Sequence, residues 1–148
     1  MFAFHAGFVH VDDLVRRLSF ADRNDPSGNH YFIMGCSEES EEEAVADMKN
    51  VYIERDDQCW GGYGGIVSVI LERDSLTLHL TSQMATRMGG HEVIRVTFVL
   101  RDAEFRELRQ VLTFVMAGYE SQLEVRPEQM AAIRPSAEFS VFETPSAN

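Results

Sequence analysis

The sequence is short of the residues that most directly define a class of protein. It has only two cysteines in 148 residues, Cys36 and Cys59, too few for a disulfide framework in a chain of this length. We therefore expect reduced thiols, as in a protein of the cytosol. No apolar run approaches the roughly 18 residues that a membrane-spanning helix needs. The apolar segment 1–15 has no basic start and is interrupted by Asp12 and Asp13, so it is not expected to be a signal peptide. These absences predict a cytoplasmic protein.

Positive charge is also scarce. The chain carries 13 Lys and Arg residues against 24 Asp and Glu residues, so its formal net charge is −11. Five glutamates fall within residues 38–43 and are expected to stay in solvent because they repel one another. A surface this negative repels nucleic-acid phosphates and anionic membranes, so we expect neither as a partner. It favours a basic protein partner, and solubility alone is the alternative explanation of the charge.

The motifs that define common enzyme and metal sites are missing. The sequence has no Gly-x-Ser-x-Gly motif, no His-x-His pair and no Cys-x-x-Cys pair, and its five histidines are scattered. We therefore expect no catalysis, no metal and no cofactor. Two enzyme alternatives remain. One is a nucleophilic pair of Cys59 with His79 or His91. The other is a divalent cation bound by Glu54 and Asp56, which point to the same side of a strand.

Alternating apolar residues predict a series of strands. The clearest are residues 66–71 and 76–81, which are joined by a polar tetrapeptide and are predicted to form a hairpin. A short helix is predicted to follow over residues 82–88, ended by a Gly-Gly pair. Further strands are predicted at residues 30–35, 51–55, 93–100 and 138–142.

One long helix is predicted after the strand 93–100. Asp102 is placed to cap its N-terminus and Gly118 to end it. Apolar residues recur every three or four positions and form one stripe, made of Phe105, Leu108, Leu112, Val115 and Met116. This stripe is expected to cover the apolar face of the sheet formed by the hairpin and the strand 93–100. We therefore predict an α+β fold: a single domain with a mainly antiparallel sheet and one long C-terminal helix packed on one face.

The two ends of the chain are less regular. Residues 2–11 suggest a strand and residues 12–18 a short helix. A short helix is expected over residues 127–133, and the chain is expected to be frayed from Thr144. No repeat or low-complexity linker divides the sequence, so residues 1–148 are expected to form one domain.

The stretch 51–66 is the most informative for function, because it combines acidic, amide and aromatic side chains with four glycines. The side chains that we expect to contact a partner are Glu54, Asp56, Asp57, Gln58, Trp60 and Tyr63. Rigid rings beside charges that orient the partner are typical of a protein-binding surface. The glycines within residues 61–65 are expected to form a turn. The alternative is that Trp60 packs beneath this turn as a core residue.

The same stretch resembles the immunity protein 10 family. The motifs that carry the resemblance are Tyr-Ile-Glu-Arg-Asp-Asp-Gln at residues 52–58 and Tyr-Gly-Gly-Ile at residues 63–66, with Tyr-Phe-Ile-Met at residues 31–34 as an early strand. The resemblance covers about residues 30–118 and is loose at both ends, so the first thirty residues and residues 119–148 are expected to be extensions. It implies a small cytoplasmic α+β protein, encoded beside a bacterial polymorphic toxin whose toxin domain it binds and neutralises. It brings no catalytic residue to this chain.

The resemblance leads to one expected function and leaves two alternatives. The expectation is that the chain binds a cognate toxin protein in the producing cell and is attracted to a basic active-site cleft on that toxin. One alternative is a small acidic secretion chaperone, which would hold an unfolded segment of an effector. The other is a small enzyme that depends on a metal or on Cys59. The sequence leaves open the identity of the toxin and whether the protein is a monomer or a homodimer.

Overall fold

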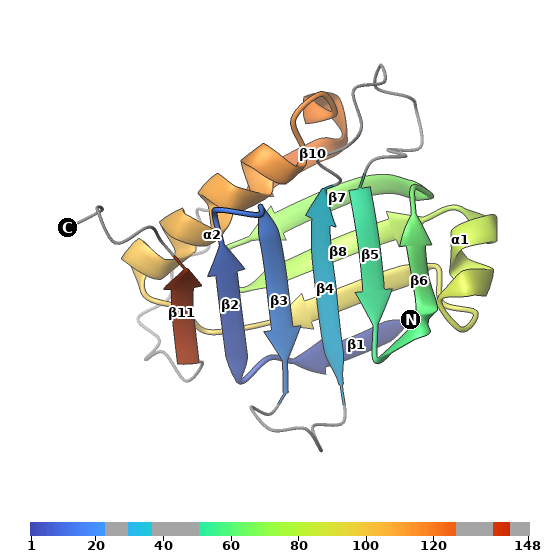
Figure 1. Ribbon diagram of the computed structural model, residues 1–148, viewed down its shortest axis with the longest axis horizontal. Helices are drawn as coiled ribbons and strands as arrows, with labels where there is room; N and C mark the ends of the chain where they lie inside the picture. The colour runs from blue at the N-terminus through green and yellow to red at the C-terminus, as the bar shows by residue number, and fades with distance from the viewer. Residues whose placement is uncertain (23–29, 37–50, 127–137, 143–148) are drawn as a thin grey trace.

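Two β-sheets lie one over the other, and the long helix α2 runs along one side of them (Figure 1). The structure is a computed structural model that describes residues 1–22, 30–36, 51–126 and 138–142. Among these residues, no helix is long and apolar enough to cross a membrane. The predicted helix at residues 127–133 and the acidic run at residues 38–43 lie outside the described residues.

The strands form two mixed sheets. The five-stranded sheet has the spatial order β1 (Phe2–His5), β9 (Val93–Thr97), β8 (Ser75–Leu80), β7 (Ile66–Glu72) and β10 (Leu123–Arg126). The six-stranded sheet has the order β11 (Glu138–Phe142), β2 (Phe8–Asp12), β3 (Arg17–Ala21), β4 (Tyr31–Cys36), β5 (Val51–Arg55) and β6 (Asp57–Tyr63). Three pairs, β1 with β9, β7 with β10 and β2 with β11, are parallel, whereas the others are antiparallel. The α+β class is confirmed, but the expected single, mainly antiparallel sheet is two mixed sheets.

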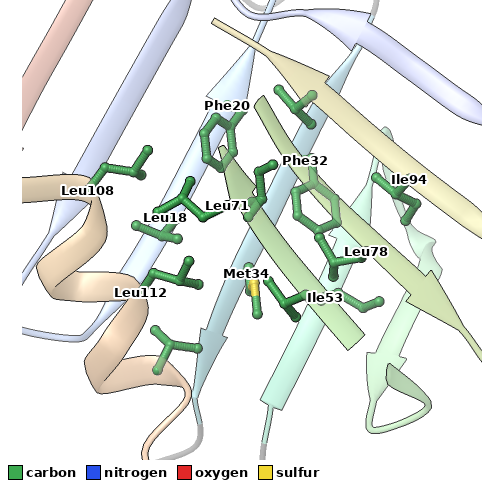
Figure 2. Packing of buried hydrophobic residues seen from close by; sticks show 14 of the residues in the cluster. Leu18, Phe20, Phe32, Met34, Ile53, Leu71, Leu78, Ile94, Leu108 and Leu112 are labelled. Atoms are coloured by element: carbon green, nitrogen blue, oxygen red, sulfur yellow. The ribbon is translucent and has the colours of Figure 1, made fainter. Parts of the chain in front are cut away.

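The core lies between the sheets and is built from the alternation of strand residues. On β3 and β4, every second side chain is buried, because successive residues of a strand point to opposite faces. Figure 2 shows the apolar side chains of both sheets meeting, among them Phe20, Phe32, Met34, Ile53, Leu71, Leu78 and Ile94. The predicted hairpin of β7 and β8 and the predicted strands β4, β5, β9 and β11 are confirmed.

Helix α2 spans Asp102–Val115 and buries the predicted apolar stripe. Its N-cap is Arg101 and not Asp102, which is the first helical residue. The reason is that Glu104 accepts a hydrogen bond from the Arg101 N–H at 2.8 Å, while the Asp102 carboxylate accepts one from Arg73 at 2.8 Å. Gly118 follows the helix with φ of 93°, a left-handed conformation that favours glycine.

The position of α2 also differs from the expectation. Its main contacts are with β2, β3 and β4 of the six-stranded sheet, and not with the hairpin that precedes it in the sequence. In Figure 2, Leu108 and Leu112 of α2 lie beside Leu18 of β3. The helix therefore closes one side of the core between the sheets, where it contacts strands from the N-terminal half of the chain.

Helix α1 (Ser82–Arg87) confirms the predicted short helix. The Thr81 hydroxyl caps it by accepting a hydrogen bond from the Met84 N–H at 3.2 Å. Gly89 and Gly90 follow with φ of 83° and 91°. A short 3₁₀ helix, η1 (Glu120–Gln122), precedes β10.

The predicted helix over residues 12–18 is wrong, because this segment contains a turn and the start of β3. The Asp12 carboxylate accepts hydrogen bonds from the N–H groups of Leu14 and Val15 at 3.0 and 3.1 Å. Such a side-chain bond to the backbone competes with helix formation and stabilises a turn. Arg16 then takes a positive φ of 59°, and the chain returns antiparallel to β2.

Candidate functional site

The six residues expected to contact a partner come from the β5–β6 hairpin, at one edge of the six-stranded sheet beside α1 (Figure 1). Among the described strands, β6 pairs only with β5. Asp57, Gln58, Trp60 and Tyr63 are exposed, Trp60 by 38% and Tyr63 by 56%. The alternative that Trp60 is a core residue is therefore wrong.

The glycine-rich segment is only partly a turn. Gly61 and Gly62 lie within β6, and the hairpin turn is at Asp56, whose φ is 63°. Gly64 and Gly65 connect β6 to β7 with positive φ of 82° and 74°.

The hairpin divides the six residues between two faces. Tyr63 pairs with Tyr52, and Gly61 with Glu54. Because cross-strand partners share a face, Tyr63, Tyr52 and Glu54 lie together on the outer face of the sheet. The Trp60 ring instead contacts the guanidinium of Arg55, which lies on the inner side of β5.

On the outer face, two phenols hold the Glu54 carboxylate. The hydroxyls of Tyr31 and Tyr52 donate to its two oxygens at 2.5 and 2.6 Å. Glu54 is only 8% exposed, and these bonds offset part of the cost of burying its charge. A Cβ at Gly61 would lie 3.1 Å from the Tyr52 hydroxyl and 2.7 Å from the Ile53 carbonyl oxygen, so glycine gives the phenol room to reach Glu54.

The same contacts alter the acidity of both phenols. Burial, followed by the hydrogen bond to Glu54, raises the pKa of Tyr52 to about 12 from 10.0. Burial and the bond to Glu54 also raise the pKa of Tyr31. Both phenols therefore remain donors throughout the neutral range.

Replacing Tyr52 with phenylalanine is expected to reduce the loss of stability at alkaline pH. Because the pKa of Tyr52 is higher in the folded chain, its contribution is complete below pH 10 and is lost as the pH rises through about 12. Urea unfolding at a series of pH values between these limits measures the effect. A Tyr52→Phe variant whose stability falls as steeply as that of the wild type would contradict the assignment.

Asp56 binds a different set of groups. Its carboxylate accepts hydrogen bonds from the Tyr31 N–H at 2.9 Å and from Arg55 Nη1 at 3.0 Å, and it lies 3.1 Å from His30 Nδ1. Asp56 thus fixes the hairpin turn against the start of β4. Glu54 and Asp56, the metal ligands of the alternative considered above, are bound by different groups, and Tyr31 gives its hydroxyl to Glu54 and its N–H to Asp56.

Arg55 is the residue that sequence reasoning missed. Its guanidinium lies between the rings of Phe2 and Trp60, at 4.6 and 3.9 Å from their centroids, and its Nε donates to the Met88 carbonyl at 2.8 Å. It is 5% exposed and joins β5, β6, β1 and the end of α1. Arg55 therefore positions Trp60 on the surface.

Asp57 and Cys59 form a local motif at the start of β6. The Asp57 carboxylate accepts a hydrogen bond from the Cys59 N–H at 3.0 Å. This bond lowers the pKa of Asp57, whereas the Asp57 carboxylate raises the pKa of the Cys59 thiol. The thiolate is the nucleophilic form, so this environment disfavours the Cys59 enzyme alternative. Within the described residues, no group of three or more His, Cys, Asp or Glu side chains could hold a metal ion.

Two hollows flank Tyr63. The outer hollow, of about 230 Å³, lies on the outer face and is lined among others by Arg17, Ile33, Gly35, Tyr52, Glu54 and Tyr63. The second, of about 580 Å³, lies between Tyr63 and α1 and includes Met84 and Arg87 in its lining. The exposed edge strand β6 therefore has a hollow on each side of Tyr63.

Exposed rings and carboxylates along one sheet edge are the features of a protein-binding surface. The family comparison specifies the class further, because the model of Immunity protein 10 matches residues 3–106. The chain belongs to this family, and it is therefore an immunity protein directed against a toxin, a class that is generally not catalytic. The match includes the whole β5–β6 hairpin, begins before the expected range of about 30–118, and ends within α2. No curated protein and no solved structure shows a significant match to the chain.

Proposed function

We propose that this protein binds and neutralises one cognate toxin domain in the cytoplasm of the producing cell, without catalysis of its own. Membership of the Immunity protein 10 family is the observation that carries the proposal. The toxin would be inhibited by occupation or distortion of its active site. Neither a nucleic acid nor a membrane is needed as a partner.

The β5–β6 hairpin is the surface that we assign to the toxin. The proposed contacts are Glu54, Asp56, Asp57, Gln58, Trp60 and Tyr63. Trp60 and Tyr63 support the assignment because both rings are exposed on an edge strand, where large apolar groups commonly anchor a partner. Since they lie on different faces of β6, a partner seated on this edge would contact both faces.

Electrostatic attraction would bring the toxin to this surface. The net charge of −11 would attract a basic cleft, with the glutamates of residues 38–43 adding to the field at long range. Such steering chiefly raises the association rate and depends on salt.

The experiment uses the cognate toxin domain, which is sought as the C-terminal domain of a large secreted protein encoded immediately upstream. The expected result is a tight complex with the folded domain, loss of toxin activity, and an association rate that falls at least about tenfold as salt is raised to ~0.5 M. Trp60→Ala and Tyr63→Ala are each expected to weaken binding by about 2 kcal/mol. Phe114→Ala, which removes an exposed ring of α2, is the matched control and should leave affinity unchanged.

Two outcomes would overturn the proposal. Binding that persists when the toxin domain is unfolded would indicate a secretion chaperone, because a chaperone holds an extended segment. Absence of any complex with the folded domain, with the toxin still active, would refute inhibition by binding. An association rate independent of salt would refute the electrostatic step alone.

A further inference from the structure

We propose that the outer hollow binds a basic side chain, lysine or arginine, of the toxin. The inference rests on the proposed function and names the chemical group that this part of the surface accepts. It is argued from the carboxylate, the rings and the floor of the hollow.

The Glu54 carboxylate is a buried anion without a cationic partner among the described residues. Within the described part of the chain, no Lys, Arg or His side chain lies within ion-pair distance of it. Tyr31 and Tyr52 each donate one hydrogen bond to it, and a carboxylate has about four acceptor positions. The phenols thus fix its orientation and leave acceptor capacity for a further donor. A carboxylate held in place in this way gains most from a cation that arrives with its own N–H donors.

The aromatic rings beside Glu54 also favour binding of a basic side chain. The centroids of Tyr52 and Tyr63 are 5.1 Å apart, and their planes are inclined by 56°. Aromatic faces attract ammonium and guanidinium groups. Ile33 provides an apolar lining for the methylene stem of a long basic side chain. The volume of about 230 Å³ is enough for one such side chain.

Among the described residues that line the hollow, Arg17 is the one that opposes a cation. It lies on β3, across Gly35 from Tyr52, and its Cβ and Cγ would be 3.6 Å from a Cβ at Gly35. Arg17 is exposed and can remain hydrated, whereas Glu54 is buried and immobilised. The buried charge therefore decides the sign of the ligand, and Arg17 reduces its affinity. Glu54 is therefore expected to raise the affinity of the hollow for a cation, and Arg17 to lower it.

Nuclear magnetic resonance titration of the whole protein tests the hollow without the toxin. The probes are n-butylammonium and n-butylguanidinium, with n-butanol as the neutral control. Saturable amide shifts are expected at Ile33, Gly35 and Tyr52 with both cations and not with n-butanol. Glu54→Gln should weaken cation binding at least about tenfold, and Arg17→Ala should strengthen it.

Two further variants separate loss of binding from loss of structure. Tyr63→Ala removes an exposed ring that has no bond to Glu54, and it should weaken binding while leaving the remaining spectrum unchanged. Glu124→Gln removes an exposed carboxylate on β10 and should bind the probes like the wild type. Shifts that are absent, that persist in Glu54→Gln, or that are abolished by Arg17→Ala would overturn the inference.

Binding of the toxin domain provides a second test of the hollow. Glu54→Gln should lower toxin affinity at least about tenfold, and a scan of the toxin's Lys and Arg residues should find one whose replacement adds nothing in the Glu54→Gln background. Unchanged toxin affinity in Glu54→Gln would refute the role of the hollow while the proposed function stands. A wild-type protein that binds the cationic probes but not the toxin would refute the proposed function instead.

Discussion

Replacing Arg55 with methionine is expected to lower the free energy of unfolding by about 3 kcal/mol, because it breaks a buried ion pair from one side. The Asp56 side chain, 12% exposed, loses its 3.0 Å bond to Arg55 Nη1, and the Met88 carbonyl loses its donor. The stacking of Phe2 and Trp60 on the guanidinium is lost as well. Urea unfolding followed by tryptophan fluorescence measures the change, since Trp60 is the only tryptophan of the chain.

Arg126→Met is the matched control for this prediction. Arg126 also pairs with carboxylates, but its side chain is 46% exposed, so its removal should cost less than about 1 kcal/mol. Equal losses in the two variants would show that burial of Arg55 contributes nothing.

Two glycines near Arg55 offer an independent check. Gly89 and Gly90 have similar positive φ, so alanine should cost each about 1 kcal/mol of backbone strain. A Cβ at Gly89 would lie 2.1 Å from Arg55 Nη2, whereas one at Gly90 meets nothing within 4 Å. Gly89→Ala should therefore be the more destabilising variant, and the difference should shrink in the Arg55→Met background. A difference unchanged by Arg55→Met would contradict this coupling.

The α-helices α1 and α2 and the strands β4, β5, β7, β8, β9 and β11 were predictable, because each depends on local alternation or on a three- to four-residue period. The buried stripe of α2 and the β7–β8 hairpin follow directly from such patterns. Strand pairing was not predictable, because the partners β1 and β9, and β2 and β11, are far apart in the sequence. Local patterns do not say which distant strands meet, so they could not give the number of sheets or the sheet that α2 contacts.

The candidate site, like the fold, could be predicted from the sequence only in part. Tyr52 and Glu54 are two residues apart on a strand, so their shared face could have been predicted. Tyr31 could not, since it reaches Glu54 only through the pairing of β4 with β5. Trp60 and Tyr63 were grouped because the glycines suggested a turn, whereas strand alternation would have separated them. Arg55 was not among the predicted contacts, because its position between two rings depends on β1, far away in the sequence.

Replacing Phe20 with alanine is expected to cost about 4 kcal/mol, because it leaves a cavity in the core between the two sheets. Phe20 of β3 is 1% exposed and stacks on Phe98, which follows β9, with centroids 5.9 Å apart and planes inclined by 21°. It also lies 6.4 Å from Phe32 on β4. The cavity would therefore open in the middle of the core, where neither sheet can collapse to fill it without distorting its own hydrogen bonds.

Two replacements distinguish this cost from a general cost of losing a phenylalanine. Phe114→Ala removes a ring of α2 that is 42% exposed and contacts Arg16, and it should cost less than about 1 kcal/mol. Phe20→Leu keeps most of the volume and should lie between the two. Thermal and urea unfolding of the three variants measure the order. A ring in the core between the two sheets cannot be removed without leaving a cavity there. A loss of stability for Phe20→Ala no larger than that for Phe114→Ala would therefore mean that other residues hold the sheets together.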